Sequence, residues 1–323
     1  MKRVFAILCL VLPMLSGVGQ DIHFSQVDAD PVLLNPAYSG FYQGDGRFGV
    51  LYRNQWASVS IPYQTLALTG EMALWRGGSR KGLSAGVSFF NDHAGTLHYG
   101  TVSGHLSLAY YCALNRAGTS ILSVGVDGGW AQSGFDPSRA EMEDGSESFA
   151  MQKVNYPLFA AGLAWYWQPT ADFHLKAGLS ARNINRPNIS YMGLDNTFME
   201  RRLSLFARAE YRCWQNVSLL PVATWQMQGE YRELLYGADI KWYIEEGGSR
   251  EVSLRAGLAV RHADAVVANM MMEYDAFLFS FSYDANVSGL SAASKGFGAF
   301  ELGLVYRFVH DSKKTKRIKC PQY

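Results

Sequence analysis

Residues 277–284 read Phe-Leu-Phe-Ser-Phe-Ser-Tyr-Asp, and this stretch decides the fold class. An aromatic ring occupies every second position, and the positions after residue 279 that alternate with the rings are polar. Successive side chains of a β-strand point to opposite faces of the sheet, so one face here is apolar and the other polar. Such a strand, continued to about 10 residues, crosses a bilayer with its aromatic face toward lipid.

The same alternation recurs toward the C-terminus, where Phe300 to Phe308 places apolar side chains outward and leaves Glu301 and Arg307 inward. A charge on the lipid-facing midplane costs roughly 2 to 4 kcal/mol, so charged strand positions are assigned to the lumen. The predicted lumen residues are Arg47, Arg53, Glu71, Lys176, Arg208, Glu210, Glu233, Asp239, Lys241, Arg255, Glu301 and Arg307. Both signs are present, which favours a narrow interior of ion pairs and water over a pore that selects one sign of ion.

Fourteen stretches of this kind follow one another and predict an all-β fold, a transmembrane antiparallel β-barrel of about 14 strands over residues 46–309. Lipid cannot hydrogen-bond a free strand edge, so the sheet must close on itself. The predicted strands are Arg47–Trp56, Tyr63–Leu74, Gly82–Phe90, His98–Ala113, Ile121–Ala131, Leu158–Trp167, Phe173–Asn183, Arg202–Cys213, Val217–Gln226, Tyr231–Ile244, Val252–Arg261, Val266–Met272, Phe277–Asp284 and Phe297–Phe308.

The connections alternate in length, which predicts an orientation. Short ones at 75–81, 168–172, 214–216, 245–251 and 273–276 are expected on the periplasmic side. Longer ones at 132–157, 184–201 and 285–296 are expected outside the cell. The first long connection is acidic (Asp136, Glu141, Glu143, Asp144 and Glu147), but it lacks EF-hand spacing and is interpreted as a solvated loop.

Two segments flank the predicted barrel. Residues 1–19 resemble a signal peptide, with Lys2 and Arg3, an apolar run from Val4 to Leu15, and the cleavage site Gly17-Val18-Gly19. Residues 20–45 form an N-terminal segment that either plugs the barrel or lies along its periplasmic rim. Residues 310–323 form a periplasmic tail with five basic side chains, which either contacts a partner or is simply solvated. Both termini are then periplasmic.

Net charge and the absence of known motifs argue against two function classes, nucleic-acid binding and enzymatic catalysis. A net charge of +1 gives no electrostatic footprint for nucleic acid. The sequence has no Gly-x-Ser-x-Gly elbow, no His-Glu-x-x-His, no Cys-x-x-Cys and no phosphate loop, so we expect no enzyme and assign no catalytic, cofactor-binding or metal residue. His93 and His98 lie near Asp92, but a loop or girdle histidine is more typical of this setting than a metal ligand.

Several short stretches together resemble the PorP/SprF-type outer-membrane proteins of the type IX secretion system of Bacteroidetes. They are His23-Phe24-Ser25-Gln26, Leu34-Asn35-Pro36-Ala37-Tyr38-Ser39-Gly40, Tyr52-Arg53-Asn54-Gln55-Trp56, Asn91-Asp92-His93-Ala94-Gly95, Ser282-Tyr283-Asp284-Ala285-Asn286 with Ser288 and Leu290, Phe300-Glu301-Leu302, and Cys320-Pro321-Gln322-Tyr323. The family ending is closer to Cys-Pro-Arg-Phe, so this chain lacks one charge there.

The resemblance implies a fourteen-stranded, FadL-like barrel that acts in secretion or surface attachment of proteins with a type IX C-terminal signal, in some members gliding adhesins. It also implies partners: periplasmic ring components and a peptidoglycan-binding OmpA-like protein. Two alternatives remain, a FadL-like passive transporter of small hydrophobic molecules and a structural anchor for the periplasmic ring. An apolar pocket leading to a gap in the wall would favour transport, and a lumen filled by ion pairs would not.

The motif residues themselves predict local shape. Pro36 restricts Asn35 to extended or turn geometry, and Gly40 suits a left-handed turn. Tyr52 and Trp56 point outward into an aromatic girdle, whereas inward Arg53 and Gln55 are placed to hold a plug by hydrogen bonds.

Overall fold

Fourteen antiparallel strands close into one barrel in the computed structural model, which describes residues 24–27, 31–42, 44–55, 62–77, 80–95, 99–136, 152–191, 197–246, 250–288 and 296–308. The strands are β1 (Gly46–Gln55), β2 (Tyr63–Arg76), β3 (Lys81–Ala94), β4 (Tyr99–Ala113), β5 (Ser120–Phe135), β6 (Gln152–Thr170), β7 (Phe173–Arg182), β8 (Arg202–Trp214), β9 (Val217–Gln228), β10 (Tyr231–Glu245), β11 (Val252–Arg261), β12 (Ala265–Tyr274), β13 (Phe277–Asn286) and β14 (Phe297–Phe308). Two helical turns, α2 (Pro31–Leu34) and η2 (Pro36–Tyr38), precede them. The predicted fold class and strand number are confirmed.

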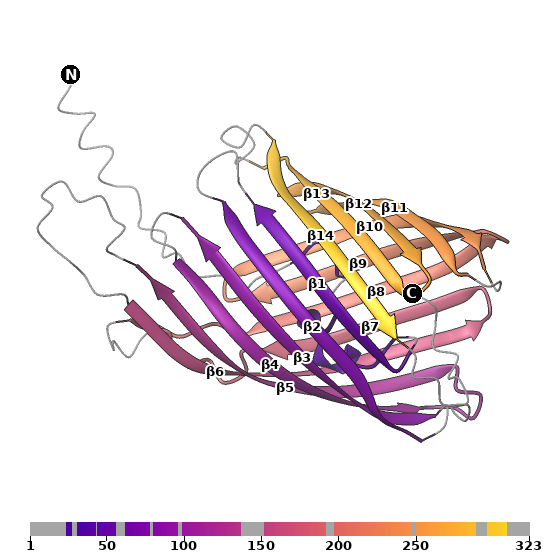
Figure 1. Ribbon diagram of the computed structural model, residues 1–323, viewed down its shortest axis with the longest axis horizontal. Coiled ribbons are helices and arrows are strands. Elements are labelled where there is room, and N and C mark those ends of the chain that lie inside the picture. Colours follow the sequence, from indigo (N-terminus) through magenta and orange to yellow (C-terminus); the bar gives the residue numbers. More distant parts are fainter. Residues whose placement is uncertain are drawn as a thin grey trace, which may run out of the picture.

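Each strand pairs with its neighbours in the chain, and β1 pairs with β14 to close the cylinder (Figure 1). The closing register places Arg53 directly opposite Glu301, so the seam between first and last strand carries opposite charges on its inner face. No helix among the described residues is long and apolar enough to cross a membrane.

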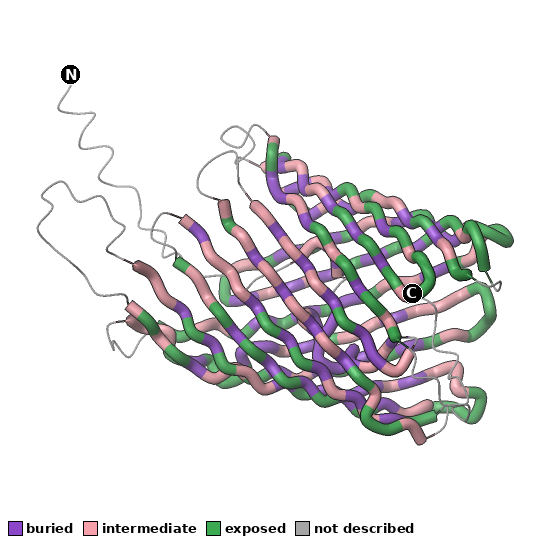
Figure 2. Tube along the Cα trace, in the orientation of Figure 1, coloured by how far each residue is buried: buried purple, intermediate pink, exposed green. Residues whose placement is uncertain are grey.

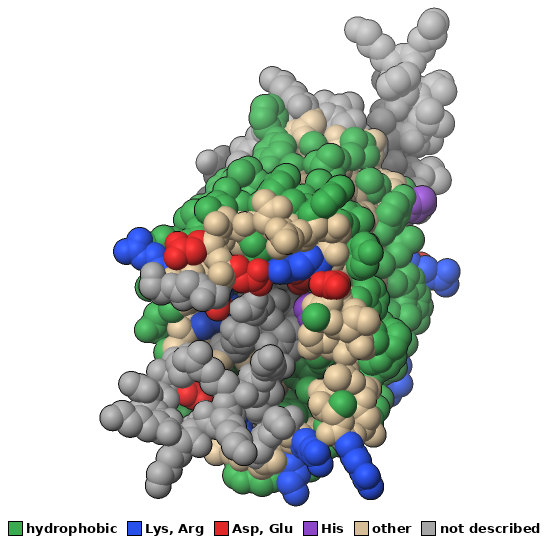
Figure 3. Space-filling view, turned by 90° about the vertical axis from the view of Figure 1, so that its right-hand side faces the viewer, with side chains coloured by type: hydrophobic (Ala, Val, Ile, Leu, Met, Phe, Trp, Pro, Cys, Tyr) green, Lys and Arg blue, Asp and Glu red, His purple; other side chains and the backbone are tan. Residues whose placement is uncertain are grey.

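Burial alternates along the strands as the sequence predicts (Figure 2). Phe279 and Phe281 on β13 are 44% and 43% exposed, whereas Ser280 and Ser282 between them are buried. Viewed from one end, hydrophobic side chains cover the side of the barrel and charged ones gather around the mouth (Figure 3). The wall therefore has an apolar outer face and a polar inner face.

The predicted lumen residues all point inward. Ten of them are buried, and the other two, Arg208 and Arg307, have side chains only 10% and 14% exposed. Several of these charges are paired between strands, as in Arg208 Nη1 on β8 with Asp239 Oδ2 on β10 at 2.8 Å. The prediction of a mixed-charge lumen is confirmed.

The predicted boundaries were wrong mainly at one hairpin. The connection predicted at 132–157 is shorter, because β5 continues to Phe135 and β6 begins at Gln152. Here Ser133 and Tyr156 hydrogen-bond across the hairpin at 2.7 Å. Small and polar residues hide the alternation at this end, so pairing with the neighbouring strand, rather than hydrophobic periodicity, decides where the strands stop.

Some predictions fall outside the described residues. They are the signal peptide at 1–19, Trp56, His98, most of the acidic loop, and the basic tail at 310–323. The described residues of the N-terminal segment, by contrast, have a defined place inside the barrel.

Candidate functional site: the lumen segment and its two anchors

The described residues between 24 and 45, which we call the lumen segment, lie inside the cylinder against the inner face of the wall. Asn35, Ala37, Tyr38 and Ser39 are at most 1% exposed. The segment contacts strands on opposite sides of the barrel, from β1, β13 and β14 at its start to β5, β6 and β7 further along. The structure thus places inside the lumen the segment for which the sequence left both lumen and rim open.

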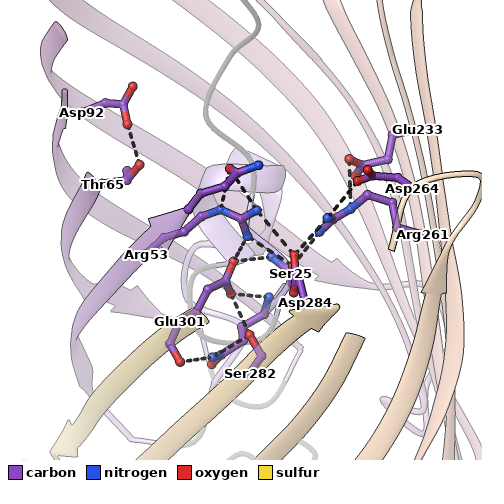
Figure 4. Close-up of polar contacts among 12 residues, drawn as sticks. Ser25, Arg53, Thr65, Asp92, Glu233, Arg261, Asp264, Ser282, Asp284 and Glu301 are labelled. Atoms are coloured by element: carbon purple, nitrogen blue, oxygen red, sulfur yellow. Dashed lines mark hydrogen bonds and ion pairs between the residues drawn. The ribbon is translucent and has the colours of Figure 1, made fainter. Parts of the chain in front are cut away.

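The first contact region, the charged anchor, consists of Ser25, Gln26, Arg53, Arg261, Asp284 and Glu301 (Figure 4). The Glu301 carboxylate accepts the backbone N–H of Ser25 at 2.8 Å and that of Gln26 at 3.0 Å. The Gln26 side-chain amide donates to Ser282 Oγ and to the Glu301 carbonyl, each at 3.2 Å. These four hydrogen bonds attach the start of the lumen segment to β14 and β13.

Ser25 lies where the charged side chains of three strands converge (Figure 4). Its hydroxyl donates to Asp284 at 2.9 Å and accepts from Arg261 Nη2 at 2.6 Å and Arg53 Nη1 at 3.3 Å. One small hydroxyl thus connects two guanidinium groups to a carboxylate. A larger apolar side chain at position 25 could not make these bonds.

The charges of the charged anchor compensate one another. Arg53 pairs with Glu301 and, at 3.4 Å, with Asp284, and Arg261 pairs with Asp284 at 2.9 Å. Arg261 also pairs with Glu233 Oε2 at 3.3 Å. Burying an ion is costly unless its partners and hydrogen bonds are all in place, so this network holds together only as a unit. Every carboxylate in it faces a guanidinium group, an arrangement that tethers rather than transfers protons.

The second contact region, the glycine anchor, consists of Asn35 to Tyr38 and the inward glycines Gly125, Gly162 and Gly178. A Cβ atom at Gly162 would lie 2.0 Å from Asn35 Oδ1, and one at Gly125 would lie 2.3 Å from the Ala37 nitrogen. Gly125 and Gly162 are paired neighbours on β5 and β6. The absence of side chains there makes room for the segment to pack directly on the backbone of the wall.

Asn35 fixes the geometry at the glycine anchor. Its Nδ2 donates to the carbonyls of Leu163 on β6 at 2.8 Å and Leu179 on β7 at 3.1 Å. Its Oδ1 accepts the Ala37 N–H at 2.9 Å and so caps the helical turn η2. Its backbone is extended (φ −156°, ψ 117°), as the following proline predicts.

Apolar contacts and a cation complete the glycine anchor. Tyr38 packs edge-on against Phe206 on β8, with ring centroids 5.8 Å apart. Lys176 Nζ lies over the Tyr38 ring, 4.3 Å from its centroid. Ser180 Oγ donates to the Leu34 carbonyl at 2.6 Å. Hydrogen bonds, dispersion and cation–π contacts, rather than ion pairs, therefore hold this region.

A third tie, from the part of the chain between the glycine anchor and β1, joins the lumen segment to β2. The N–H of Gly40 donates to Glu71 Oε2 at 3.0 Å, and Arg47 pairs with the same carboxylate. Gly40 has φ +82°, which confirms the predicted left-handed turn. Burial and the Glu71 carboxylate raise the pKa of the nearby Tyr42 phenol, which therefore stays protonated.

The sequence identified part of this site. Arg53 was predicted to hold the segment, and it does so through Ser25, whereas Gln55 accepts a hydrogen bond from Arg53 at 3.3 Å. Arg261 was missed, although it shares the inward parity of Arg255 on the same strand. The sequence did not predict that the three glycines make room for the lumen segment, because a glycine in a strand does not indicate which part of the chain packs against it. Ser25, Arg53, Asp284 and Glu301 come from four of the stretches that carry the family resemblance.

Of the residues considered for metal binding, the structure describes Asp92 and His93, and His98 lies outside the described residues. Asp92 accepts a hydrogen bond from Thr65 Oγ1 at 2.5 Å. Within the described part of the chain, no group of three or more His, Cys, Asp or Glu side chains is placed to hold a metal ion.

Comparisons with known proteins agree with this architecture. The family model described as "Type IX secretion system membrane protein PorP/SprF" matches residues 16–306. No curated protein matches the chain. Among solved structures, the toluene transporter TbuX of Ralstonia pickettii has a TM-score of 0.54 at 10% identity, covering 91% of this chain and 96% of that one. A FadL homologue of Pseudomonas aeruginosa has a TM-score of 0.51 at 12% identity, covering 85% and 93%. At such identities these likenesses show the fold alone.

Proposed function

Because this chain belongs to the PorP/SprF family of type IX secretion system membrane proteins, we propose that it is a non-enzymatic outer-membrane barrel that supports secretion or surface attachment of proteins carrying a type IX C-terminal signal. Gliding adhesins are one class of client. The observation that carries the proposal is the combination of this membership with a lumen occupied by an anchored segment of the chain itself.

The lumen segment occupies space that a client would need in order to pass through the barrel. The lumen segment is fixed to β14 at one side and to β6 and β7 at another, and breaking the charged anchor would leave buried charges unpaired. A folded client could not share that space. The protein therefore acts through its outer surfaces, loops and termini, holding clients or machine components rather than conducting them through its interior.

The lengths of the connections indicate which end of the barrel faces the periplasm. Three two-residue connections, at 171–172, 215–216 and 275–276, lie at one end of the barrel, and β14 ends there beside the start of β1. The connection at 229–230, at the other end, is equally short, but the two longest connections, 136–151 and 183–201, also lie at that other end. Short turns are typical of the periplasmic side of such barrels. We place both termini there, where the basic tail faces periplasmic ring components and an OmpA-like peptidoglycan-binding protein.

The alternative, passive transport of small hydrophobic molecules, shares this fold with TbuX and the FadL homologue. The inner face of this barrel is lined with charged residues that pair with one another and with the lumen segment. Such a lining offers an apolar molecule no favourable path. The third reading, a structural anchor for the ring, differs from the first only in assigning the contacts to the short turns and tail.

Crosslinking followed by co-purification from detergent-extracted outer membranes tests the proposal. We expect type IX components and signal-bearing clients with the full-length chain. A matched chain ending before Asp311 separates the readings: retained clients with lost ring components assign the ring contact to the tail. If both samples lack type IX components and clients while fatty acid co-elutes, the transporter reading replaces the proposal.

A further inference from the structure

The outer face of the barrel has a groove over β6 to β9 with a volume of about 480 Å³. Its floor is a row of outward alanines, Ala177, Ala207 and Ala223, which are direct register neighbours on β7, β8 and β9. Larger outward side chains border the row. They are Leu122, Leu163, Trp165, Leu179, Leu205, Trp225 and Leu234. All of these side chains are apolar.

The alanine row differs from the outer face of β11 to β14. Across β11 to β14 a comparable outward row reads Leu254, Met272, Phe279 and Leu304, all large. Each of these side chains is at least 39% exposed and fills the surface that faces lipid. The groove therefore arises from three small residues aligned on adjacent strands and not from a bend or a missing strand.

The floor of the groove is closed and supported from inside. The β6–β7 ladder runs without interruption from Ala161 to Trp167, so the groove does not open into the lumen there. On the inner side, Phe206 packs on Tyr38, and the Asn35 amide holds the carbonyls of Leu163 and Leu179. The lumen segment thus supports the inner side of the wall behind the alanines. The groove on the outer side is therefore present before anything binds in it.

We propose that this groove binds one acyl chain of a membrane phospholipid. It is continuous with the apolar side chains exposed on the outer face of the barrel, and no polar side chain lines it. An extended polypeptide seated there would leave its backbone N–H and C=O groups unsatisfied in hydrocarbon, whereas an acyl chain has none. Within a bilayer the gain comes from close van der Waals contact, which small residues permit by letting the chain approach the backbone.

The position of the headgroup follows from the aromatic residues. Trp165 borders the groove and stacks on Trp167, with centroids 5.7 Å apart, and Trp167 meets Phe173 edge-on at 6.0 Å. Trp165 Nε1 also donates to Ser120 Oγ at 3.0 Å, beside the β4–β5 turn. Such aromatic groups mark the membrane interface. The bound lipid accordingly belongs to the leaflet at the short-turn end, with its chain running from Trp165 past Ala207 toward Leu205.

Native mass spectrometry of the full-length barrel tests this inference. The protein is reconstituted in vesicles of palmitoyl-oleoyl phosphatidylethanolamine, extracted with detergent, and examined for retained lipid. Ala207→Phe fills the groove and is expected to lower the occupancy of the retained lipid at least about tenfold. The matched control is Ala268→Phe, which adds the same ring to an exposed outward alanine on β12 and should leave occupancy unchanged.

Ala223→Leu is a smaller change that fills the same floor and carries the test if the phenylalanine variant does not fold, as judged by its heat-dependent shift in electrophoresis. Equal lipid retention in the wild type and in all folded variants would overturn the proposal. So would a crosslink from the variant Ala207→Cys to a second barrel or another protein, because the groove would then be a protein contact. Neither result bears on the proposed role in secretion.

Discussion

The two anchors of the lumen segment solve the same problem with opposite chemistry. At the charged anchor, side chains reach across the lumen and join the segment through Ser25 and two buried arginines. At the glycine anchor, side chains are removed from the wall so that backbone and segment touch. The first is long-range and directional, whereas the second is short-range and depends on fit.

The two anchors are therefore disrupted by different kinds of substitution. A buried ion network loses its compensation when one member is removed, so its loss is large and shared by all members. A packed contact against glycine is lost through added volume, and its cost depends on how far the neighbours can shift. The predictions below separate these two behaviours.

The largest effect is expected from Arg53→Ala. This change leaves Glu301, which is fully buried, without its guanidinium partner, and breaking a buried pair in this way costs about 3 to 5 kcal/mol. We expect the protein to unfold at a lower midpoint concentration of guanidinium chloride, and we expect faster proteolysis of the N-terminal segment. The double variant Arg53→Met with Glu301→Gln removes both charges, keeps an oxygen that can accept from the N–H groups of Ser25 and Gln26, and should recover much of the loss. If the double variant is as unstable as the single one, the ion pair is not the cause.

Gly162→Leu tests the glycine anchor by adding volume. Its Cβ would overlap Asn35, and inserting extra carbons into a packed site costs about 1 to 3 kcal/mol. Because the charged anchor is untouched, we expect proteolysis near residues 35–40 with Ser25 still protected. Gly104→Ala is the control, since a Cβ there meets nothing within 4 Å. Equal proteolysis in both variants would contradict the role of the glycines.

Asn35→Asp distinguishes hydrogen-bond donation from shape. The substitution keeps the oxygen that caps η2 but replaces the amide that donates to two wall carbonyls with a carboxylate that would repel them. Losing a hydrogen bond and leaving its partners unsatisfied costs about 1 to 3 kcal/mol. We expect Asn35→Asp to unfold at lower denaturant than Asn35→Ala. The reverse order would show that the cap matters more than the donation.

The smallest effect concerns an exposed ion pair, the counterpart of the buried ones. Glu246 accepts two hydrogen bonds from Arg212 at 2.8 Å, and these bonds hold the pKa of Glu246 below its ordinary value of 4.5. The stabilisation is therefore present above that value and is lost as the pH falls through the lower pKa of the folded protein. The pair is partly solvent-exposed, so Glu246→Gln should change stability at neutral pH by less than about 1 kcal/mol. Unfolding midpoints of the two proteins should converge in acid; a constant difference down to pH 3 would contradict the assignment.

The two anchors also differ in how far the sequence predicts them. Inward Arg53 and Glu301 follow from alternation alone, because a charge on the other face would meet lipid. Their meeting with Ser25 does not follow, since residues 25 and 301 are brought together only when β14 closes on β1. At the glycine anchor, Asn35-Pro36 predicts the local turn, but nothing near Gly162 in the chain indicates that Asn35 will lie against it.

By itself, the sequence determined which face of each strand is apolar, how many strands there are, and that the barrel carries paired charges inside. These features are local, because period-two alternation and the cost of a charge in lipid act on each strand separately. Only the tertiary structure decided that the N-terminal segment fills the lumen, which inward charges join to hold it, and where the aligned alanines leave a groove. These features depend on strand register and on closure of the barrel, which bring together residues far apart in the chain. A local sequence pattern does not show which distant residues will meet.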